Sequence, residues 1–412
     1  MRILATKPNP ELVTLPWHLP LERWPEKHVV QLPRGLSRHV VRFVRVGEHT
    51  CAVKETDELI ARREYHLLRD LRKMSLPSVV PQAVVTGRKN EQGEWLPCAL
   101  VTRHLRFSLP YRSLFAHGMR ADSLPMLVDA LVVLLVRLHL SGFFWGDVSL
   151  SNVLFRRSAE EFAAYLVDAE TGELHETLTN GQRGHDLMVA AENVYAELLD
   201  LQAGGFVDTR TDPAEVVEML EQRYDALWGA LTSSAEFETT EGEPWRIEQW
   251  VESLNDLGFD IDEMDIVPDP EGNRVRLQPR VVEAGHHSRE LRSLTGLDVE
   301  EAQARRMLND IASYIAHKDL GEWPREAAAN RWVTEIYEPL VRMVPKQLRG
   351  RLDGPQIFHE VLVHRWLLAE RAGHDVGIFD AGQDYIDNVL SQKPDEALAT
   401  NADDPDVLMV QE

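Results

Sequence analysis

Three polar side chains, Asp147, Asn152 and Asp168, stand where apolar elements of the sequence end or begin. An apolar helix ends at Gly142, the loop that follows presents Asp147, and Asn152 comes five residues later, just before an apolar strand. A carboxylate and a carboxamide at this spacing can share one site, in which the aspartate accepts a hydroxyl proton and the asparagine oxygen holds a metal ion. Taken alone, the segment is better explained by turn hydrogen bonds of the two side chains.

The hairpin predicted after Asn152 brings a second carboxylate, Asp168, back to the same end of the strands. The pattern at 152–168 predicts a hairpin whose second strand, Tyr165-Leu166-Val167, ends on Asp168. An aspartate that closes a buried apolar strand is costly unless it meets a cation. Mg²⁺ prefers one or two carboxylates together with amide and phosphate oxygens. Asp168 and Asn152 are therefore the predicted metal ligands.

A helix predicted from about Asp57 to Met74 carries a carboxylate on its apolar face. Glu64 follows Ile60 by four residues and precedes Leu67 by three, so it points into that face. A buried carboxylate needs a cationic partner, and Lys54, at the end of an apolar strand, is the natural candidate. The alternative is that both side chains extend to water.

The order of elements predicts an α+β fold. A mostly antiparallel sheet of five short strands, with one helix inserted after the third, precedes a region in which helices dominate from residue 124 onward. A small sheet lobe (28–105) and a helical lobe (106–235) are expected, behind an N-terminal extension (1–27). The strands are expected at 28–32, 40–46, 50–54, 83–86 and 97–102.

A further, mostly helical domain is predicted at 244–392, after a polar boundary at 232–243. An irregular stretch is expected at 260–280, and a frayed acidic tail at 393–412. The expected helices lie near 245–257, 288–294, 298–317, 324–343 and 355–372.

Composition limits the partners. The 412 residues carry 44 basic and 67 acidic side chains, a net charge of −23, which argues against wholesale coating of nucleic acid. Residues 26–120 nevertheless carry a net +8, so a local anion site, or RNA binding through this segment, is an open alternative. Cys51 and Cys98 are expected to be buried, reduced thiols. No signal peptide or membrane span is predicted, so we expect a cytoplasmic protein.

Residues 28–235 resemble the protein-kinase-like superfamily, and most closely its bacterial lipopolysaccharide-kinase-like branch. Lys54, in Ala52-Val53-Lys54, is similar to the lysine that pairs with the phosphates, and Glu64 to its helix partner. Asp147 then corresponds to the catalytic base, and Asn152 and Asp168 to the metal ligands. In Gly184-His185-Asp186, Asp186 resembles the buried aspartate that supports the catalytic loop. The domain at 244–392 resembles the uncharacterised domain that follows such kinase-like halves in some bacteria.

Four departures from the family pattern stand out. The glycine-rich loop is missing; Gly35 is its one remnant, and Ser37 and Arg38 would replace the lost phosphate contacts. A serine, Ser149, takes the position of the catalytic-loop lysine of protein kinases. Trp145 stands two residues before Asp147, where the family has histidine. Two residues after Asp168, Glu170 replaces the family's glycine and is either an added metal ligand or a surface residue.

The sequence thus predicts a two-lobed, ATP- and Mg²⁺-dependent phosphotransferase. Lys54 would orient the phosphates, and Asp147 would accept the proton of a hydroxyl acceptor on a small molecule, glycan or protein. The alternative is a nucleotide-binding pseudokinase that regulates or scaffolds a protein partner through its C-terminal domain.

Overall fold

The computed structural model describes residues 1–30, 32, 39–116, 123–232, 235–238, 259–268 and 274–394, with strands β12–β14 and residue 116 as backbone alone. The chain divides into two compact units. The first comprises 1–156 and 164–224, and the second comprises 157–163 and 225–412. The first unit thus includes the segment 1–27 that the sequence set apart as an extension, and the second begins earlier than residue 244.

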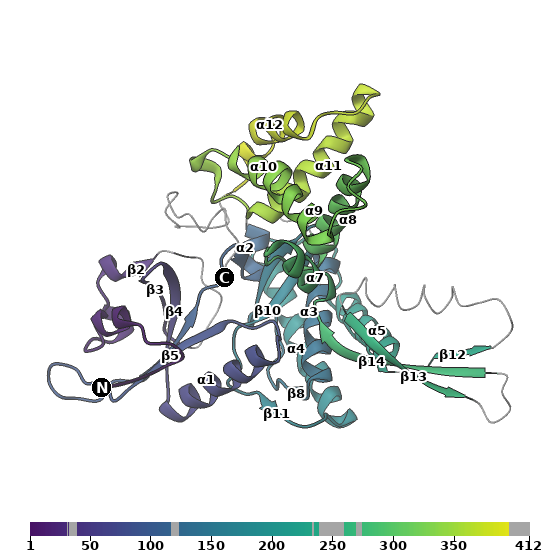
Figure 1. The fold of residues 1–412 in the computed structure, drawn as a ribbon. Helices are drawn as coiled ribbons and strands as arrows, with labels where there is room; N and C mark the ends of the chain where they lie inside the picture. Colours follow the sequence, from purple (N-terminus) through teal and green to yellow (C-terminus); the bar gives the residue numbers. More distant parts are fainter. Residues whose placement is uncertain are drawn as a thin grey trace. The chain divides into compact units, whose positions relative to one another are not determined.

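The first unit is built on a six-stranded sheet, in the order β1-β5-β6-β4-β3-β2 (Figure 1). All of its pairings are antiparallel, as the sequence predicts. The sheet has one strand more than expected, because the short segment β1, whose apolar pattern is weak, pairs with β5. The strands are β1 (Arg2–Ala5), β2 (Val29–Val30), β3 (Val41–Val46), β4 (His49–Thr56), β5 (Val80–Thr86) and β6 (Cys98–Arg103).

Helix α1 (Glu58–Lys73) follows β4 and contacts β5 and β6. It begins where the sequence predicts, because the Asp57 carboxylate caps it by accepting a hydrogen bond from the amide of Leu59. Its apolar face lies against the sheet, with Leu68 and Leu71 fully buried. The expected helix is therefore confirmed, and its buried face packs against the sheet that contains β4, the strand of Lys54.

A buried ion pair holds the N-terminal segment against β4. Arg88 donates to the Glu55 carboxylate at 2.7 Å and to the backbone carbonyls of Trp17 and Leu19. Its side chain is completely buried. Glu55 is the neighbour of Lys54, and successive side chains of a strand point to opposite faces of the sheet. The pair therefore fixes the strand from the face opposite Lys54.

The rest of the first unit is mainly helical. Helix α3 (Leu124–Leu140) confirms the predicted core helix, and the hairpin β9 (Val153–Ser158) and β10 (Glu161–Leu166) confirms the pattern at 152–168. Among the described residues we find no helix with both the length and the apolar character needed to span a membrane. The other elements of this part are α2 (Tyr111–Ala116), α4 (Asn180–Ala203), α5 (Pro213–Thr232) and the two-residue strands β7 (Ser108–Leu109), β8 (Phe143–Phe144) and β11 (Glu173–Leu174). The boundary between the units falls within α5, after Tyr224.

The second unit contains helices packed around an apolar core that includes Trp332, Tyr337 and Phe358. The helix expected at 324–343 is interrupted by a π-helical turn at Val333–Tyr337. The helices are α7 (His286–Thr295), α8 (Glu301–His317), α9 (Arg325–Trp332), α10 (Glu338–Arg342), α11 (Gly354–Ala372) and α12 (Ile378–Asn388), the last of which was not predicted.

The expectation of an irregular stretch at 260–280 is wrong. Strands β13 (Phe259–Pro268) and β14 (Arg274–Ala284) form an antiparallel pair there, and β12 (Ala235–Glu238) joins β14. The apolar residues of β14 do alternate, but a register shift between Ile261 and Glu263 breaks the alternation in β13 and hides the signal. The helix expected at 245–257 and most of the acidic tail lie outside the described residues.

Both cysteines are free and buried, as predicted. Burial raises the pKa of the Cys51 thiol to about 12, against the opposing effect of Arg103. Burial also raises the pKa of Cys98. The structure thus leaves neither cysteine as a reactive thiolate near neutral pH.

The Arg88 pair can be tested by substitution. Arg88→Met should lower the stability of the sheet by about 3–5 kcal/mol, because it leaves the Glu55 carboxylate buried without its cation. The measurement is urea-dependent hydrogen exchange of peptides from β4 and β6. Arg112→Met removes an exposed partner of Asp200 and should cost less than about 1 kcal/mol. Equal losses in the two variants would contradict the role given to Arg88.

Candidate active site

The predicted pair of Lys54 and Glu64 is present. The Lys54 ammonium, from β4, lies 3.0 Å from the carboxylate of Glu64, from α1. The Glu64 side chain is only 1% exposed. Glu64 thus lies on the buried face of α1 as predicted, although Ile60, from which the spacing was counted, is itself 37% exposed. The alternative in which both side chains extend to water is wrong.

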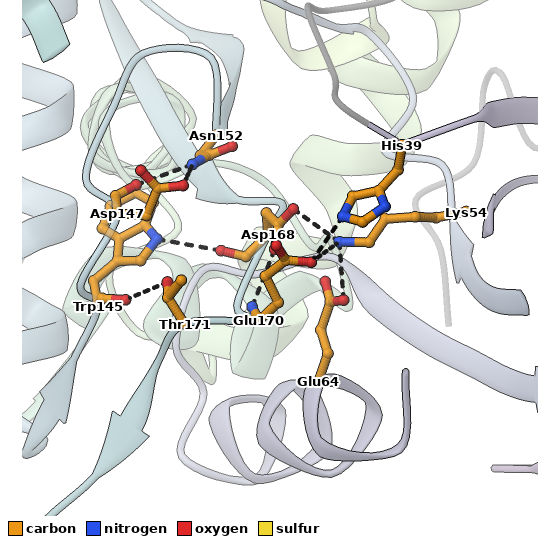
Figure 2. A network of polar contacts seen from close by, with 9 residues as sticks. All are labelled: His39, Lys54, Glu64, Trp145, Asp147, Asn152, Asp168, Glu170 and Thr171. Carbon is orange, nitrogen blue, oxygen red and sulfur yellow. Dashed lines mark hydrogen bonds and ion pairs between the residues drawn. The ribbon is translucent and has the colours of Figure 1, made fainter. Parts of the chain in front are cut away.

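Two further carboxylates meet the same ammonium (Figure 2). Lys54 donates to Asp168 at 2.8 Å and to Glu170 at 3.1 Å. Glu170 also contacts the His39 ring at 3.1 Å and is 9% exposed, so it is not a surface residue. One ligand atom from each of Glu64, Asp168 and Glu170 can be chosen so that all three lie within 4.8 Å of one another. Within the described part of the chain, three carboxylates therefore converge on one ammonium.

The pKa values reflect this surplus of negative charge. Burial of the Lys54 ammonium lowers its pKa, but the charges of Glu64, Asp168 and Glu170 raise it more, so the net shift is upward. Burial raises the pKa of Glu64 to about 7; Lys54 opposes the shift, and the nearby Asp168 and Glu170 add to it. The lysine is thus firmly cationic, and the cluster retains more acidic groups than one cation neutralises.

Asp168 is held in place by hydrogen bonds to both its side chain and its backbone. Its carboxylate accepts a hydrogen bond from the amide of Glu170 at 3.0 Å. Its carbonyl accepts one from the indole nitrogen of Trp145 at 3.2 Å. Trp145 is fully buried, and its own carbonyl accepts a hydrogen bond from the hydroxyl of Thr171. Trp145 therefore ties the loop of Asp147 to the segment of Asp168 (Figure 2).

Asp147 and Asn152 contact each other directly. The Asn152 amide nitrogen donates to the Asp147 carboxylate at 3.0 Å and to its backbone carbonyl at 2.9 Å. In Figure 2 the oxygen end of the Asn152 amide lies on the side away from Asp147. The turn hydrogen bonds weighed in the sequence analysis are thus present, and they leave the orientation of the amide oxygen compatible with a metal ligand.

Asp186 holds the loop of Asp147 through hydrogen bonds to the loop backbone. Its carboxylate accepts hydrogen bonds from the amides of Trp145 at 2.8 Å and Gly146 at 2.7 Å, and it lies 3.0 Å from Nε2 of His139. Burial lowers the pKa of His139 although Asp186 opposes the shift, so the ring is neutral. We assign Nε2–H as the donor to Asp186, with the Tyr224 hydroxyl donating to Nδ1 at 2.7 Å. Asp186 thus has the location that supports the loop.

Two residues that the sequence analysis did not select hold the rest of this loop. The Asn193 amide donates to the carbonyl of Val148 at 2.9 Å. Glu197 accepts hydrogen bonds from the amides of Leu150 and Ser151 at 2.9 and 2.8 Å, and from the Ser151 hydroxyl. Burial raises the pKa of Glu197, and these three bonds oppose the shift.

A helical spacing explains how these residues act together. Asp186, Asn193 and Glu197 are seven and then four residues apart in α4, which places them on one face of the helix. Helix α4 begins at Asn180, six residues before Asp186, because Thr179 and Gln182 form a capping box. Polar residues at this spacing on a mostly apolar helix were therefore the signal that could have identified Asn193 and Glu197.

Three predicted residues are not tested by this geometry. Gly35, Ser37 and Arg38, expected to contact phosphate, lie outside the described residues. His39, the next residue along, was not predicted as a site residue; no pattern in the sequence marks it.

Comparison with known proteins adds two findings. Residues 226–390 match a family described as a domain of unknown function, DUF4032. The expectation of an uncharacterised C-terminal domain is thus confirmed, although the match begins at 226 rather than 244. A solved structure described as "WaaP in complex with acyl carrier protein" is similar with a TM-score of 0.33 and 16% identity, over 55% of this chain and 100% of that chain. The search of curated proteins gave no match.

The support of the loop by Asp186 can be tested by hydrogen exchange. Asp186→Asn should reduce the protection of the Trp145 and Gly146 amides by about 1.5–3 kcal/mol, because both donate to a buried charged acceptor. Peptides that cover 143–150 report the change, and peptides from α1 provide the reference. Asp200→Asn changes an exposed aspartate of the same helix and should leave exchange in 143–150 unaltered. Unchanged exchange in the Asp186 variant would contradict this role.

Proposed function

We propose that the first unit is a two-lobed, kinase-like phosphotransferase that uses ATP and Mg²⁺ and transfers a phosphoryl group to a hydroxyl acceptor. The observation that carries this proposal is the convergence of Glu64, Asp168 and Glu170 on the single ammonium of Lys54. A buried cluster with more carboxylates than cations is suited to bind a further cation.

The donor set fits Mg²⁺. Asp168 and Glu170 offer carboxylate oxygens, Asn152 offers an amide oxygen, and these are the ligand types that Mg²⁺ takes beside phosphate oxygens. The Asp168 carboxylate and the Asn152 loop are both held by hydrogen bonds, so these two ligands are already oriented. When bound, the ion would neutralise phosphate charge.

Lys54 and Glu64 have distinct roles in this proposal. Glu64 is almost completely buried and ion-paired with Lys54, so it fixes the direction of the lysine side chain. Lys54 would exchange part of its present contact with Glu170 for a phosphate oxygen of ATP. Nucleotide and metal would then share the charges that the carboxylates and the ammonium now balance alone.

Asp147 would accept the proton of the acceptor hydroxyl. Its carboxylate is oriented by the Asn152 amide, and its loop is held by the bonds of Asp186 and Glu197. A base held in this way contributes by position and by proton transfer together.

One observation favours a second candidate, a nucleotide-binding regulator without transfer activity. The Glu170 carboxylate accepts a hydrogen bond from the Lys54 ammonium and is also in hydrogen-bond contact with the ring of His39. If this arrangement persists with ATP present, the nucleotide binds but its phosphates are not aligned for transfer. In that case a protein partner would recognise the nucleotide-bound state through the second unit.

Binding and transfer test the two candidates separately. The wild-type chain should be stabilised by ATP, more strongly with Mg²⁺ than without, since a ligand that binds only the folded state raises the melting temperature. Lys54→Met and Asp168→Asn should remove this stabilisation. Asp147→Asn should retain it but lower transfer of the ATP γ-phosphate to a cell extract, or to water, by about 100- to 10,000-fold.

Matched controls are available on α1. Lys73 and Asp70 form an exposed ion pair there, so Lys73→Met and Asp70→Asn repeat the same chemical changes away from the site. Both should behave as wild type. Mg²⁺-dependent binding without transfer by wild type would favour the regulator, and absence of ATP binding would contradict both candidates.

A further inference from the structure

The end of the β9–β10 hairpin, at 157–163, belongs to the second compact unit; it comprises the turn and the adjoining residues of both strands, whose remaining residues belong to the first unit. This hairpin connects the two proposed metal ligands. Strand β9 begins immediately after Asn152, and β10 ends two residues before Asp168. The base of the hairpin is closed by a hydrogen bond from the amide of Val167 to the carbonyl of Asn152 at 3.0 Å.

Gln356 binds the tip of the turn with both ends of its side chain. Its amide oxygen accepts a hydrogen bond from the backbone N–H of Ala159, and its amide nitrogen donates to the carbonyl of the same residue, both at 3.0 Å. Ala159 has a φ of 57°, a left-handed conformation that non-glycine residues rarely adopt. The two hydrogen bonds from Gln356 satisfy both the N–H and the carbonyl of this unusual turn residue.

Gln303 extends the contact. Its amide nitrogen donates to the carbonyl of Arg157 at 3.2 Å and to the Gln356 side chain at 3.1 Å. The Ser158 hydroxyl accepts a hydrogen bond from the amide of Ala302 at 3.2 Å. Ser158, Gln303 and Gln356 are each no more than 3% exposed, so this polar network is buried and specific.

Helix ends orient the two glutamines. Gln303 is in the first turn of α8 and forms a capping box with Glu300: its backbone amide donates to the Glu300 side chain, and its side-chain oxygen accepts a hydrogen bond from the amide of Glu300. Gln356 is in the first turn of α11, and its amide is capped by Asp353. Since each helix start is itself capped, the side chains that reach the hairpin are held on rigid elements.

We propose that Gln303 and Gln356 are positioning residues for the metal site, and that the DUF4032 region thereby controls the phosphotransferase. The two glutamines hold the hairpin turn, the paired strands transmit that constraint along their ladder, and the spacing of Asn152 and Asp168 follows from it. This inference rests on the proposed function, because it assigns the hairpin ends as metal ligands.

The inference has a specific consequence for metal affinity. With the turn released, Asn152 and Asp168 sample more separations, and a small ion that demands near-ideal octahedral geometry is affected most. Lys54 lies on β4 and is also held by Glu64 of α1, so its contacts with the nucleotide depend less on the hairpin than the metal ligands do. Loss of the two glutamines should therefore weaken binding of the metal, with less effect on ATP measured without it.

The test uses the full chain with Gln303→Ala, Gln356→Ala and the double variant. Mn²⁺, a spectroscopic substitute for Mg²⁺, is titrated in the presence of ATP and followed by electron paramagnetic resonance. The double variant should bind Mn²⁺ about 10-fold more weakly, the lower end of the effect of residues that orient metal ligands. Hydrogen exchange in peptides covering 153–167 should rise, and exchange in α1 should stay the same.

Two further variants separate positioning from loss of stability. Tyr314→Phe removes a hydrogen bond to Glu335 in the same unit without touching the hairpin, and it should leave Mn²⁺ affinity unchanged. Ser158→Ala removes one bond from the hairpin side and provides a milder variant if the glutamine variants fail to fold. It should weaken Mn²⁺ binding in the same direction.

The outcomes distinguish the inference from the function on which it rests. Wild-type affinity for Mn²⁺ in the double variant and in Ser158→Ala would overturn the inference while leaving the phosphotransferase intact. Absence of Mn²⁺ binding by wild type would overturn the proposed function and the metal-ligand role with it. Exchange in 153–167 would then still decide whether the glutamines hold the hairpin.

Discussion

The Lys54 ammonium is the charge on which the rest of the first unit depends. It lies inside the molecule, where burial opposes its charge, and three carboxylates from two other segments hold it there. Glu64 comes from α1, and Asp168 and Glu170 come from the segment after the hairpin. The position of α1 against the sheet and the path of the chain after β10 are therefore both tied to this one group, so a change at Lys54 affects all three segments at once.

A second centre, Asp186, plays the same part for the loop of Asp147. Its carboxylate binds backbone amides rather than a side-chain cation, so it fixes the course of the loop through the main chain. Trp145 connects the two centres, because its amide binds Asp186 and its indole binds the carbonyl of Asp168. A tryptophan at position 145 therefore helps to order both the loop of Asp147 and the segment of Asp168.

Much of this site followed from local patterns. The period of α1 placed Glu64 on the buried face, and the hairpin returned Asp168 beside the loop of Asp147, because helix and strand periods determine which side chains share a face. Contacts between distant segments had no such pattern. His39 meets Glu170 across 131 positions, and Gln356 meets Ala159 across 197, and only the folded chain brings them together. The strands at 259–284 were missed for a different reason, since a register shift masks their alternation.

The charge balance also bears on how the site would differ between its states. In a cluster with more carboxylates than cations, the carboxylates share the single lysine, so the negative charge of each is only partly neutralised. Glu170 has a second polar contact in the folded chain, with the ring of His39. A bound divalent ion would supply the missing positive charge, and Glu170 would then either join the metal ligands or lose its contact with His39. Glu170 is thus the residue at which the two proposed functions diverge, because they differ in what Glu170 would contact once a nucleotide is bound.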